Sequence, residues 1–173
     1  MGAVDGRCLL QVGDVPAACF RIADFGILGE VNGDGVNSYR RPVRGGCPDT
    51  EFDIGRWPQL PRVDIAYAYA GEDGQAVRAV AAAGAKGIVV AALPGGRLSP
   101  AQKDACMQAL GSGIVIAIST RAGSGRAHLA RDLLDCGMLA ADNLSCQKAR
   151  ILLTLALTVS TQISVIARIF RLF

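Results

Sequence analysis

Residues 62–97 constrain the fold more than any other stretch, because two short apolar runs flank a segment rich in alanine. The runs VDIAYAYA (63–70) and KGIVVAAL (86–93) are too short for ordinary helices and carry β-branched and aromatic residues, which is typical of strands. Alanine favours helices, so the segment 73–84 between the runs is predicted to be helical. The pattern indicates a β-α-β unit, in which a crossover helix joins two parallel strands.

The same alternation continues to the last residue. Further strands are predicted at 114–120 and 138–141, and further helices at 100–111, in a stretch from Leu129 to Leu134, at 146–159 and from about Gln162 onward. Ser99 and Ser145 each precede a helical pattern as N-caps. Because residues 87–93 are almost continuously apolar, the sheet is expected to be covered on both faces. The predicted fold class is α/β, a small parallel sheet with helices on both faces, preceded by a short β-hairpin segment.

The amino-terminal part has a different pattern. Residues 1–45 show short strand-like runs at 8–12 and 17–22 and hairpin-type turn residues in VNGDGV (31–36). Residues 46–61 are rich in Pro, Gly and acidic residues, which is typical of a linker, and Trp57 is expected to anchor that linker onto the following domain. The predicted organisation is a β segment at 1–45, a linker at 46–61 and an α/β domain at 62–173. Strands separated from a complete sheet favour aggregation or association with another chain, so an oligomer or poor solubility is expected.

Composition excludes several classes of function. Hydrophobic residues make up 51% and charged residues 19%, so the chain is globular, and the single basic cluster at 40–44 lacks the aromatic residues of a nucleic-acid surface. With six cysteines in no CxxC pair and one histidine, no metal or other cofactor is expected. The uncharged run 151–167 is interrupted by polar residues, so packed helices rather than a membrane span are expected. No secretory signal is recognisable, which favours a cytoplasmic location.

Motifs for catalysis are weak. Gly123 and Gly125 begin a possible GxGxxG motif, but His128 occupies the position of the third glycine, and no catalytic nucleophile with a base is recognisable. Glu72 and Asp73 are expected to stabilise the start of a helix. Ligands of parallel sheets usually lie beyond the carboxyl ends of the strands, which here are followed by residues 71–74 and 94–100.

Four segments resemble the C-terminal domain of the bacterial L-asparaginase and glutaminase family, in the family's order and spacing. They are LPRVDIAYAYAG (60–71), AAGAKGIVVAAL (82–93), STRAGSGR (119–126) and AADNLSCQKARILLTLAL (140–157). Upstream, residues 24–43 and 47–54 resemble the hairpin and linker that close the family's N-terminal domain. The resemblance implies a Rossmann-like domain of an amidohydrolase that acts on asparagine or glutamine.

The same resemblance implies that the nucleophile is missing from these 173 residues. The family carries its threonine nucleophile in a TGGTIA-like motif and a second threonine with an aspartate in a GTDT-like motif, and neither motif occurs here. We therefore expect a truncated family member with no catalytic residue, inactive alone. Two alternatives are a binding or regulatory module that holds a small amino acid such as asparagine or pairs with a full-length relative, and one half of a split enzyme.

The resemblance also implies a contact site. In the family, a loop after the second strand of this domain, usually GNGN, helps to complete the active site of a neighbouring subunit. Here the loop reads PGGR, so Gly95 and Arg97 stand where asparagines are expected. The candidate substrate-binding or subunit-contact residues are Gly95, Gly96 and Arg97, with Arg97 suited to a carboxylate. The implied partner is a second copy or another asparaginase-family chain.

Overall fold

The computed structural model describes residues 29–32, 35–39, 50–123 and 125–173, and the chain divides into two units, Met1–Thr50 and Glu51–Phe173. In the first unit, β1 (Gly29–Asn32) and β2 (Gly35–Ser38) pair antiparallel, with Asn32 opposite Gly35. This pairing confirms the predicted hairpin. The strands predicted at 8–12 and 17–22 lie outside the described residues.

The second unit is built on one parallel sheet of four strands. They are β3 (Val63–Tyr67), β4 (Gly87–Ala92), β5 (Val115–Thr120) and β6 (Leu139–Ser145), and they lie side by side in the order in which the chain forms them. The two central strands are buried along their whole length, which agrees with their apolar sequences. The predicted α/β class is confirmed.

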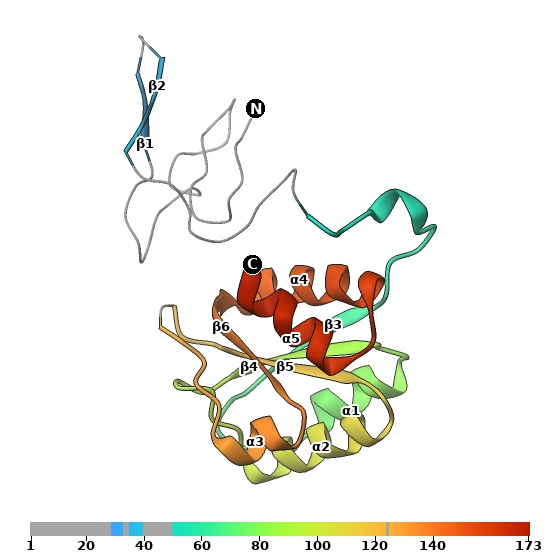
Figure 1. The fold of residues 1–173 in the computed structure, drawn as a ribbon. Helices are drawn as coiled ribbons and strands as arrows, with labels where there is room; N and C mark the ends of the chain where they lie inside the picture. Colours follow the sequence, from blue (N-terminus) through green and yellow to red (C-terminus); the bar gives the residue numbers. More distant parts are fainter. Residues whose placement is uncertain (1–28, 33–34, 40–49, 124) are drawn as a thin grey trace. The chain divides into compact units, whose positions relative to one another are not determined.

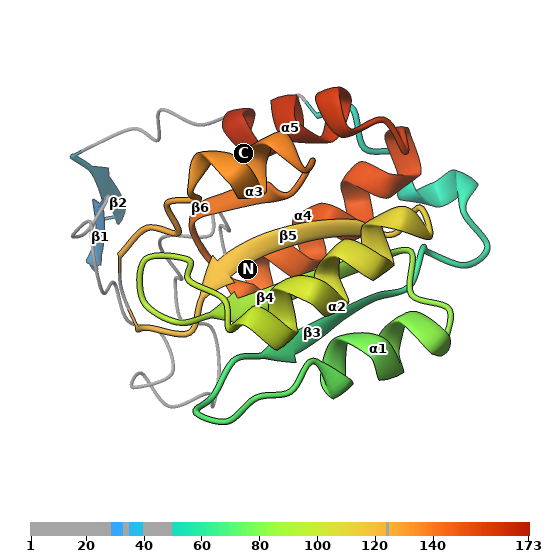
Figure 2. The same ribbon diagram turned by 90° about the horizontal axis from the view of Figure 1, so that it is seen from below.

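Helices cover both faces of this sheet (Figures 1 and 2). One face carries the crossover helices, which are α1 (Gln75–Ala82), α2 (Pro100–Gly111) and α3 (Arg131–Asp135). The other face carries α4 (Cys146–Val159) and α5 (Ile163–Leu172). Each face has its own apolar core, because alternate strand residues point to opposite sides: Ile88 and Val90 pack with α1–α3, whereas Val89 and Ala91 pack with α4 and α5.

Three element boundaries differ from the sequence-based prediction. The first strand ends at Tyr67 rather than at residue 70, because the chain turns there and the Glu72 amide donates to the Tyr69 carbonyl. Leu129 is buried but precedes α3, since Ala127 is held extended by an isolated bridge to Asp142. The helix begins only at Arg131. The last strand runs to Ser145 rather than to residue 141.

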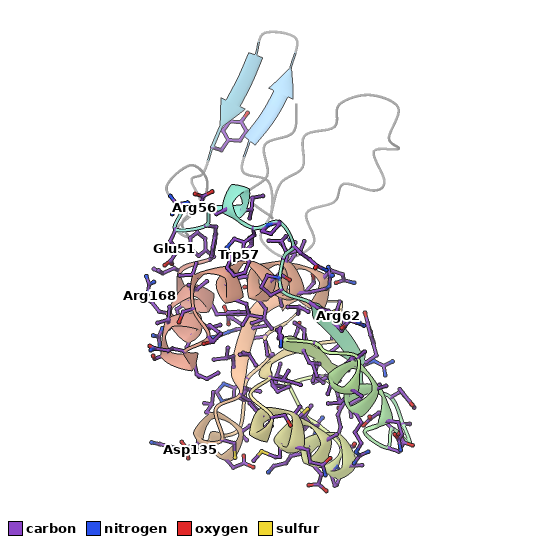
Figure 3. The ribbon with its side chains drawn as sticks, turned by 90° about the vertical axis from the view of Figure 1, so that its right-hand side faces the viewer. Glu51, Arg56, Trp57, Arg62, Asp135 and Arg168 are labelled. Atoms are coloured by element: carbon purple, nitrogen blue, oxygen red, sulfur yellow. The ribbon has the colours of Figure 1, made fainter. Side chains whose placement is uncertain are left out.

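The segment that enters the second unit is held against its last helix (Figure 3). The rings of Phe52 and Phe173 lie 5.2 Å apart, and Glu51 forms an ion pair of 2.7 Å with Arg168 of α5. Trp57 follows the short 3₁₀ helix η2 (Ile54–Arg56) and remains 41% exposed. Phe52, rather than the predicted Trp57, is therefore the aromatic anchor. The division between the two units falls inside the predicted linker.

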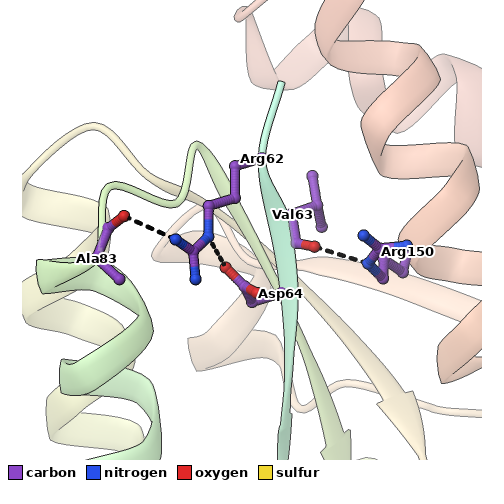
Figure 4. A network of polar contacts seen from close by, with 5 residues as sticks. All are labelled: Arg62, Val63, Asp64, Ala83 and Arg150. Carbon is purple, nitrogen blue, oxygen red and sulfur yellow. Dashed lines mark hydrogen bonds and ion pairs between the residues drawn. The ribbon is translucent and has the colours of Figure 1, made fainter. Parts of the chain in front are cut away.

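Two arginines flank the edge strand β3 (Figure 4). Arg150 of α4 donates from Nε to the Val63 carbonyl at 2.7 Å. On the other side, Arg62 donates to the Asp64 carboxylate at 2.6 Å and to the Ala83 carbonyl at 3.0 Å. Charged side chains along an edge strand oppose pairing with another strand. The edge of the sheet is thus attached to both helical layers.

Candidate functional site

The segments that follow the carboxyl ends of β3, β4 and β5 form what we call the carboxyl-end surface, made of residues 68–74, 93–97 and 121–123. In a parallel sheet these ends meet at one edge, which is where ligands of such sheets usually bind. The surface contains Gly95, Gly96 and Arg97, the contact residues that the family resemblance implies.

Residues 93–97 make a tight turn. The Leu93 amide donates to the Arg97 carbonyl at 3.0 Å, and the Gly96 and Arg97 amides donate back to the Leu93 carbonyl at 2.9 and 3.2 Å. Gly95 and Gly96 have φ of 81° and 80°, a left-handed conformation that side chains with a Cβ adopt at a cost. Gly96 is buried, and a Cβ there lies 3.4 Å from the His128 carbonyl oxygen. The two glycines therefore allow the left-handed backbone conformation that this turn requires.

Arg97 is the exposed member of this turn. Its Nε lies 3.4 Å from the Pro94 carbonyl oxygen, which is a weak hydrogen bond within the turn itself. No carboxylate of the described residues forms an ion pair with Arg97. Its guanidinium is consequently available to a group from outside this domain.

Glu72 organises the segment after β3. Its carboxylate accepts from the Gly74 amide at 2.6 Å and from the Ser99 hydroxyl at 3.0 Å, and the side chain is 5% exposed. Asp73 accepts from the Gln75 amide at 3.0 Å, at the start of α1. Both carboxylates thus support the helix start, as the sequence predicts, and Glu72 also ties α1 to the N-cap of α2.

Arg121 connects three strand ends. Its backbone amide donates to the Ala92 carbonyl at 2.8 Å, at the end of β4. Its side-chain Nη1 donates to the Ala68 carbonyl at 2.6 Å, just after β3. The side chain is otherwise exposed and forms no ion pair within the described part of the chain. Sequence reasoning missed this residue, because its only signal is a position directly after a strand.

Tyr67 and Cys146 meet where β3 ends and α4 begins. The Tyr67 hydroxyl and the Cys146 sulfur share a hydrogen bond of 3.4 Å, and Cys146 donates to the Gln147 side-chain oxygen at 3.3 Å. The bond to Cys146 raises the pKa of the Tyr67 hydroxyl above its ordinary value, whereas the positive charge of Arg121 lowers it. A neutral phenol is therefore favoured at this end of the sheet. No sequence motif marks this pair, which sequence reasoning also missed.

The strand order bears on ligand binding. Crevices at the carboxyl edge of α/β sheets form where the strand order reverses, so that neighbouring crossover helices lie on opposite faces. Here the order β3-β4-β5-β6 has no reversal, and all three crossover helices lie on one face. The carboxyl-end surface therefore lacks such a crevice among the described residues.

The serine and threonine hydroxyls for which the structure gives hydrogen bonds, at the strand ends and in α4, bond to backbone groups. Ser119 donates to the Leu144 carbonyl at 2.6 Å, and the Thr120 hydroxyl accepts from the Ala122 amide at 3.1 Å. Thr154 and Thr158 each donate to a carbonyl of their own helix. Within residues 50–123 and 125–173, no threonine hydroxyl is hydrogen-bonded to a lysine, histidine or carboxylate. That same part of the chain contains no cluster of metal-binding side chains.

Comparisons with known proteins agree on one family. Residues 62–170 match the family model described as the glutaminase/asparaginase C-terminal domain. L-asparaginase 2 of Escherichia coli K12 is 32% identical over 170 residues, which are 97% of this chain and 49% of that protein. L-asparaginase 2 of Bacillus subtilis 168 is 35% identical over 80% of this chain and 37% of its own length. The crystal structure of a probable cytoplasmic L-asparaginase from Campylobacter jejuni superposes with a TM-score of 0.84 at 33% identity, covering 89% of this chain and 49% of that one.

The chain spans about half the length, or less, of the relatives it matches. The matched region holds the whole parallel sheet and the carboxyl-end surface. In the described part of the chain, no helix has the length and apolar character needed to cross a membrane.

Proposed function

Because the chain belongs to the glutaminase/asparaginase family through its C-terminal domain, we propose that it supplies one wall of an amidohydrolase site and not the attacking group. The observation that carries this proposal is the family match over residues 62–170, the domain that presents the carboxyl-end surface. The substrate class is a small amino acid with a side-chain amide, asparagine or glutamine. The nucleophile lies outside these 173 residues.

The 173 residues are inactive alone in this proposal. Acyl transfer by a threonine needs its hydroxyl within hydrogen-bond reach of a base. The hydroxyls of Thr120, Thr154 and Thr158 are bonded to backbone groups instead. The strand order, which lacks a reversal, also supports a surface that is completed from outside rather than a pocket within the domain.

The partner that completes the site is a longer asparaginase-family chain. A second copy of this chain is the other expected partner, but it does not supply the nucleophile. The turn at 93–97 supports this proposal, because its glycines give it a compact shape and Arg97 remains exposed at its end. Arginine binds carboxylates through two parallel hydrogen bonds, so Arg97 is suited to the carboxylate of an amino acid or of a partner side chain. Gly95 is the exposed glycine that a partner can approach closely, and buried Gly96 shapes the turn.

Ammonia release from asparagine and from glutamine tests the proposal. The purified chain is expected to release none, whereas a mixture with an asparaginase-family chain that carries the TGGTIA-like and GTDT-like motifs but lacks its own C-terminal domain is expected to gain activity. Arg97→Ala in this chain should weaken the gain. Arg56→Ala serves as the matched control, because Arg56 precedes β3 and, among the described residues, forms an ion pair only with exposed Asp53. Turnover by the chain alone, abolished by a change within it, contradicts the proposal.

A binding module is the rival function. Calorimetric titration of the purified chain with asparagine, aspartate and glutamine separates the two: heat of binding without any partner chain favours the module. The cytoplasmic location stays a prediction, and the Campylobacter jejuni relative is itself described as probably cytoplasmic.

A further inference from the structure

The Ala68 carbonyl accepts a hydrogen bond from a side chain rather than from the neighbouring strand. Along the β3–β4 ladder, the Gly87 amide donates to the Arg62 carbonyl, and the Ala68 amide donates to the Ala91 carbonyl. The same alternation, continued to the end of the ladder, pairs the Ala68 carbonyl with the Leu93 amide. That amide is instead used by the 93–97 turn, where it donates to the Arg97 carbonyl at 3.0 Å.

Ala68 is only 2% exposed, so its carbonyl needs a donor from the protein. Arg121 provides one, through Nη1 at 2.6 Å. The turn at 93–97 and the side chain of Arg121 are therefore linked. Leu93 is free to close the turn because Arg121 takes its place in the ladder.

We propose that Arg121 is the positioning residue of the carboxyl-end surface, because it holds the segment after β3 and frees Leu93 to close the turn that carries Gly95, Gly96 and Arg97. It does so from the end of β5, where its own amide is bonded to Ala92 of β4. One residue thereby sets the relative placement of all three segments. The inference builds on the proposed function. Only its activity test depends on that function, whereas the hydrogen-exchange test does not.

Amide hydrogen exchange of the full 173-residue chain tests the positioning role directly. In Arg121→Met, the Ala68 carbonyl loses a charged donor and competes for the Leu93 amide. Exchange at Gly96 and Arg97, whose amides close the turn on the Leu93 carbonyl, should then rise by about tenfold to a hundredfold, the range for a hydrogen bond to a charged group. Amides inside β4 and β5 should keep their protection. Arg121→Lys, whose ammonium also donates, should restore most of it.

Arg97→Met is the matched control, since Arg97 lies on the same surface but, among the described residues, its side chain bonds only within its own turn. It should leave exchange at Gly96 unchanged. Should Arg121→Met fail to fold, Arg121→Gln, which stays polar but is too short to reach Ala68, replaces it. Unchanged exchange in the turn, or no recovery with lysine, overturns the proposal.

The activity readout separates this inference from the proposed function. In the mixture with a nucleophile-bearing family chain, Arg121→Met should lower ammonia release and Arg121→Lys should restore it. If the wild-type mixture is inactive, the proposed function fails while the exchange result still decides the role of Arg121. If the mixture is active and Arg121→Met has no effect on it, Arg121 does not position the surface for the partner.

Discussion

Gln102 is a buried amide without a hydrogen-bond partner among the described residues. It is 0% exposed on α2, and neither its Nε2 nor its Oε1 is paired. Burying an unpaired amide costs about 1–3 kcal/mol in mutational data. Gln102→Leu, which has similar volume and no polar atoms, is therefore expected to raise the free energy of unfolding by about 1–3 kcal/mol, measured by urea denaturation.

Gln108→Leu is the control for that measurement, because Gln108 lies exposed on the same helix and has a long 3.4 Å contact with Arg78. Its effect should stay within about 0.5 kcal/mol. A loss of stability in Gln102→Leu contradicts the prediction, since it means that the amide has a partner worth more than an apolar side chain.

Cys106 gives the domain a dependence on alkaline pH. Burial, and secondarily the charge of Glu72, raises the pKa of its thiol from 9.0 to about 12. Because the folded pKa lies above the unfolded one, the stabilising contribution is complete below about pH 9 and is lost between about pH 9 and pH 12. Each pH unit in this window lowers stability by up to about 1.4 kcal/mol.

The variant Cys106→Ala isolates this contribution. Urea denaturation of both chains at about pH 8 and about pH 10 should show a smaller decrease for the variant, because other groups titrate equally in the two chains. Equal decreases in the two chains refute the assignment to Cys106.

At the scale of elements, the contact between α1 and α2 depends on Gly74. Gly74 and Gly95 have nearly the same left-handed φ, 80° and 81°. A Cβ at Gly74, however, lies 2.6 Å from the Ala101 backbone oxygen, whereas a Cβ at Gly95 has no atom within 4 Å. Backbone atoms of a packed helix cannot move aside as a side chain can. Gly74 is therefore where the two helices approach most tightly at their amino ends.

Alanine substitutions at these two glycines separate conformational cost from packing cost. Gly95→Ala should cost about 1–2 kcal/mol, the cost of a left-handed backbone conformation alone. Gly74→Ala adds overpacking, which typically costs a further 1–3 kcal/mol. Thermal unfolding of both variants measures the difference, and equal losses would show that α1 and α2 can separate freely.

At the scale of the whole molecule, residues 51–173 contain the complete sheet, both apolar cores and the Phe52 anchor. A chain that begins at Glu51 is therefore expected to fold cooperatively on its own. Circular dichroism during heating should show a single transition, at a midpoint close to that of the full chain. A fragment that lacks a cooperative transition contradicts this expectation.

The sequence predicted most of the α/β fold. Apolar runs such as residues 87–92 and caps such as Ser99 and Ser145 are local signals, and the strands and helices they predict were found. The predictions failed where a partner distant in sequence decides the outcome. Leu129 lies outside a helix because Asp142 holds Ala127, and the ring that packs beside Phe173 is that of Phe52, while Trp57 is 41% exposed.

The candidate site likewise combines features that the sequence predicts with features that only the fold decides. The sequence by itself determined that glycines and an arginine follow the second strand of the parallel sheet, because residue identity and spacing are enough to place a turn at a strand end. Only the tertiary structure decided that the Leu93 amide bonds within the turn instead of to the neighbouring strand, and that the side chain of Arg121, at the end of another strand, donates to the Ala68 carbonyl in its place. A hydrogen bond between residues far apart in sequence depends on strand order and register, and no local pattern encodes it.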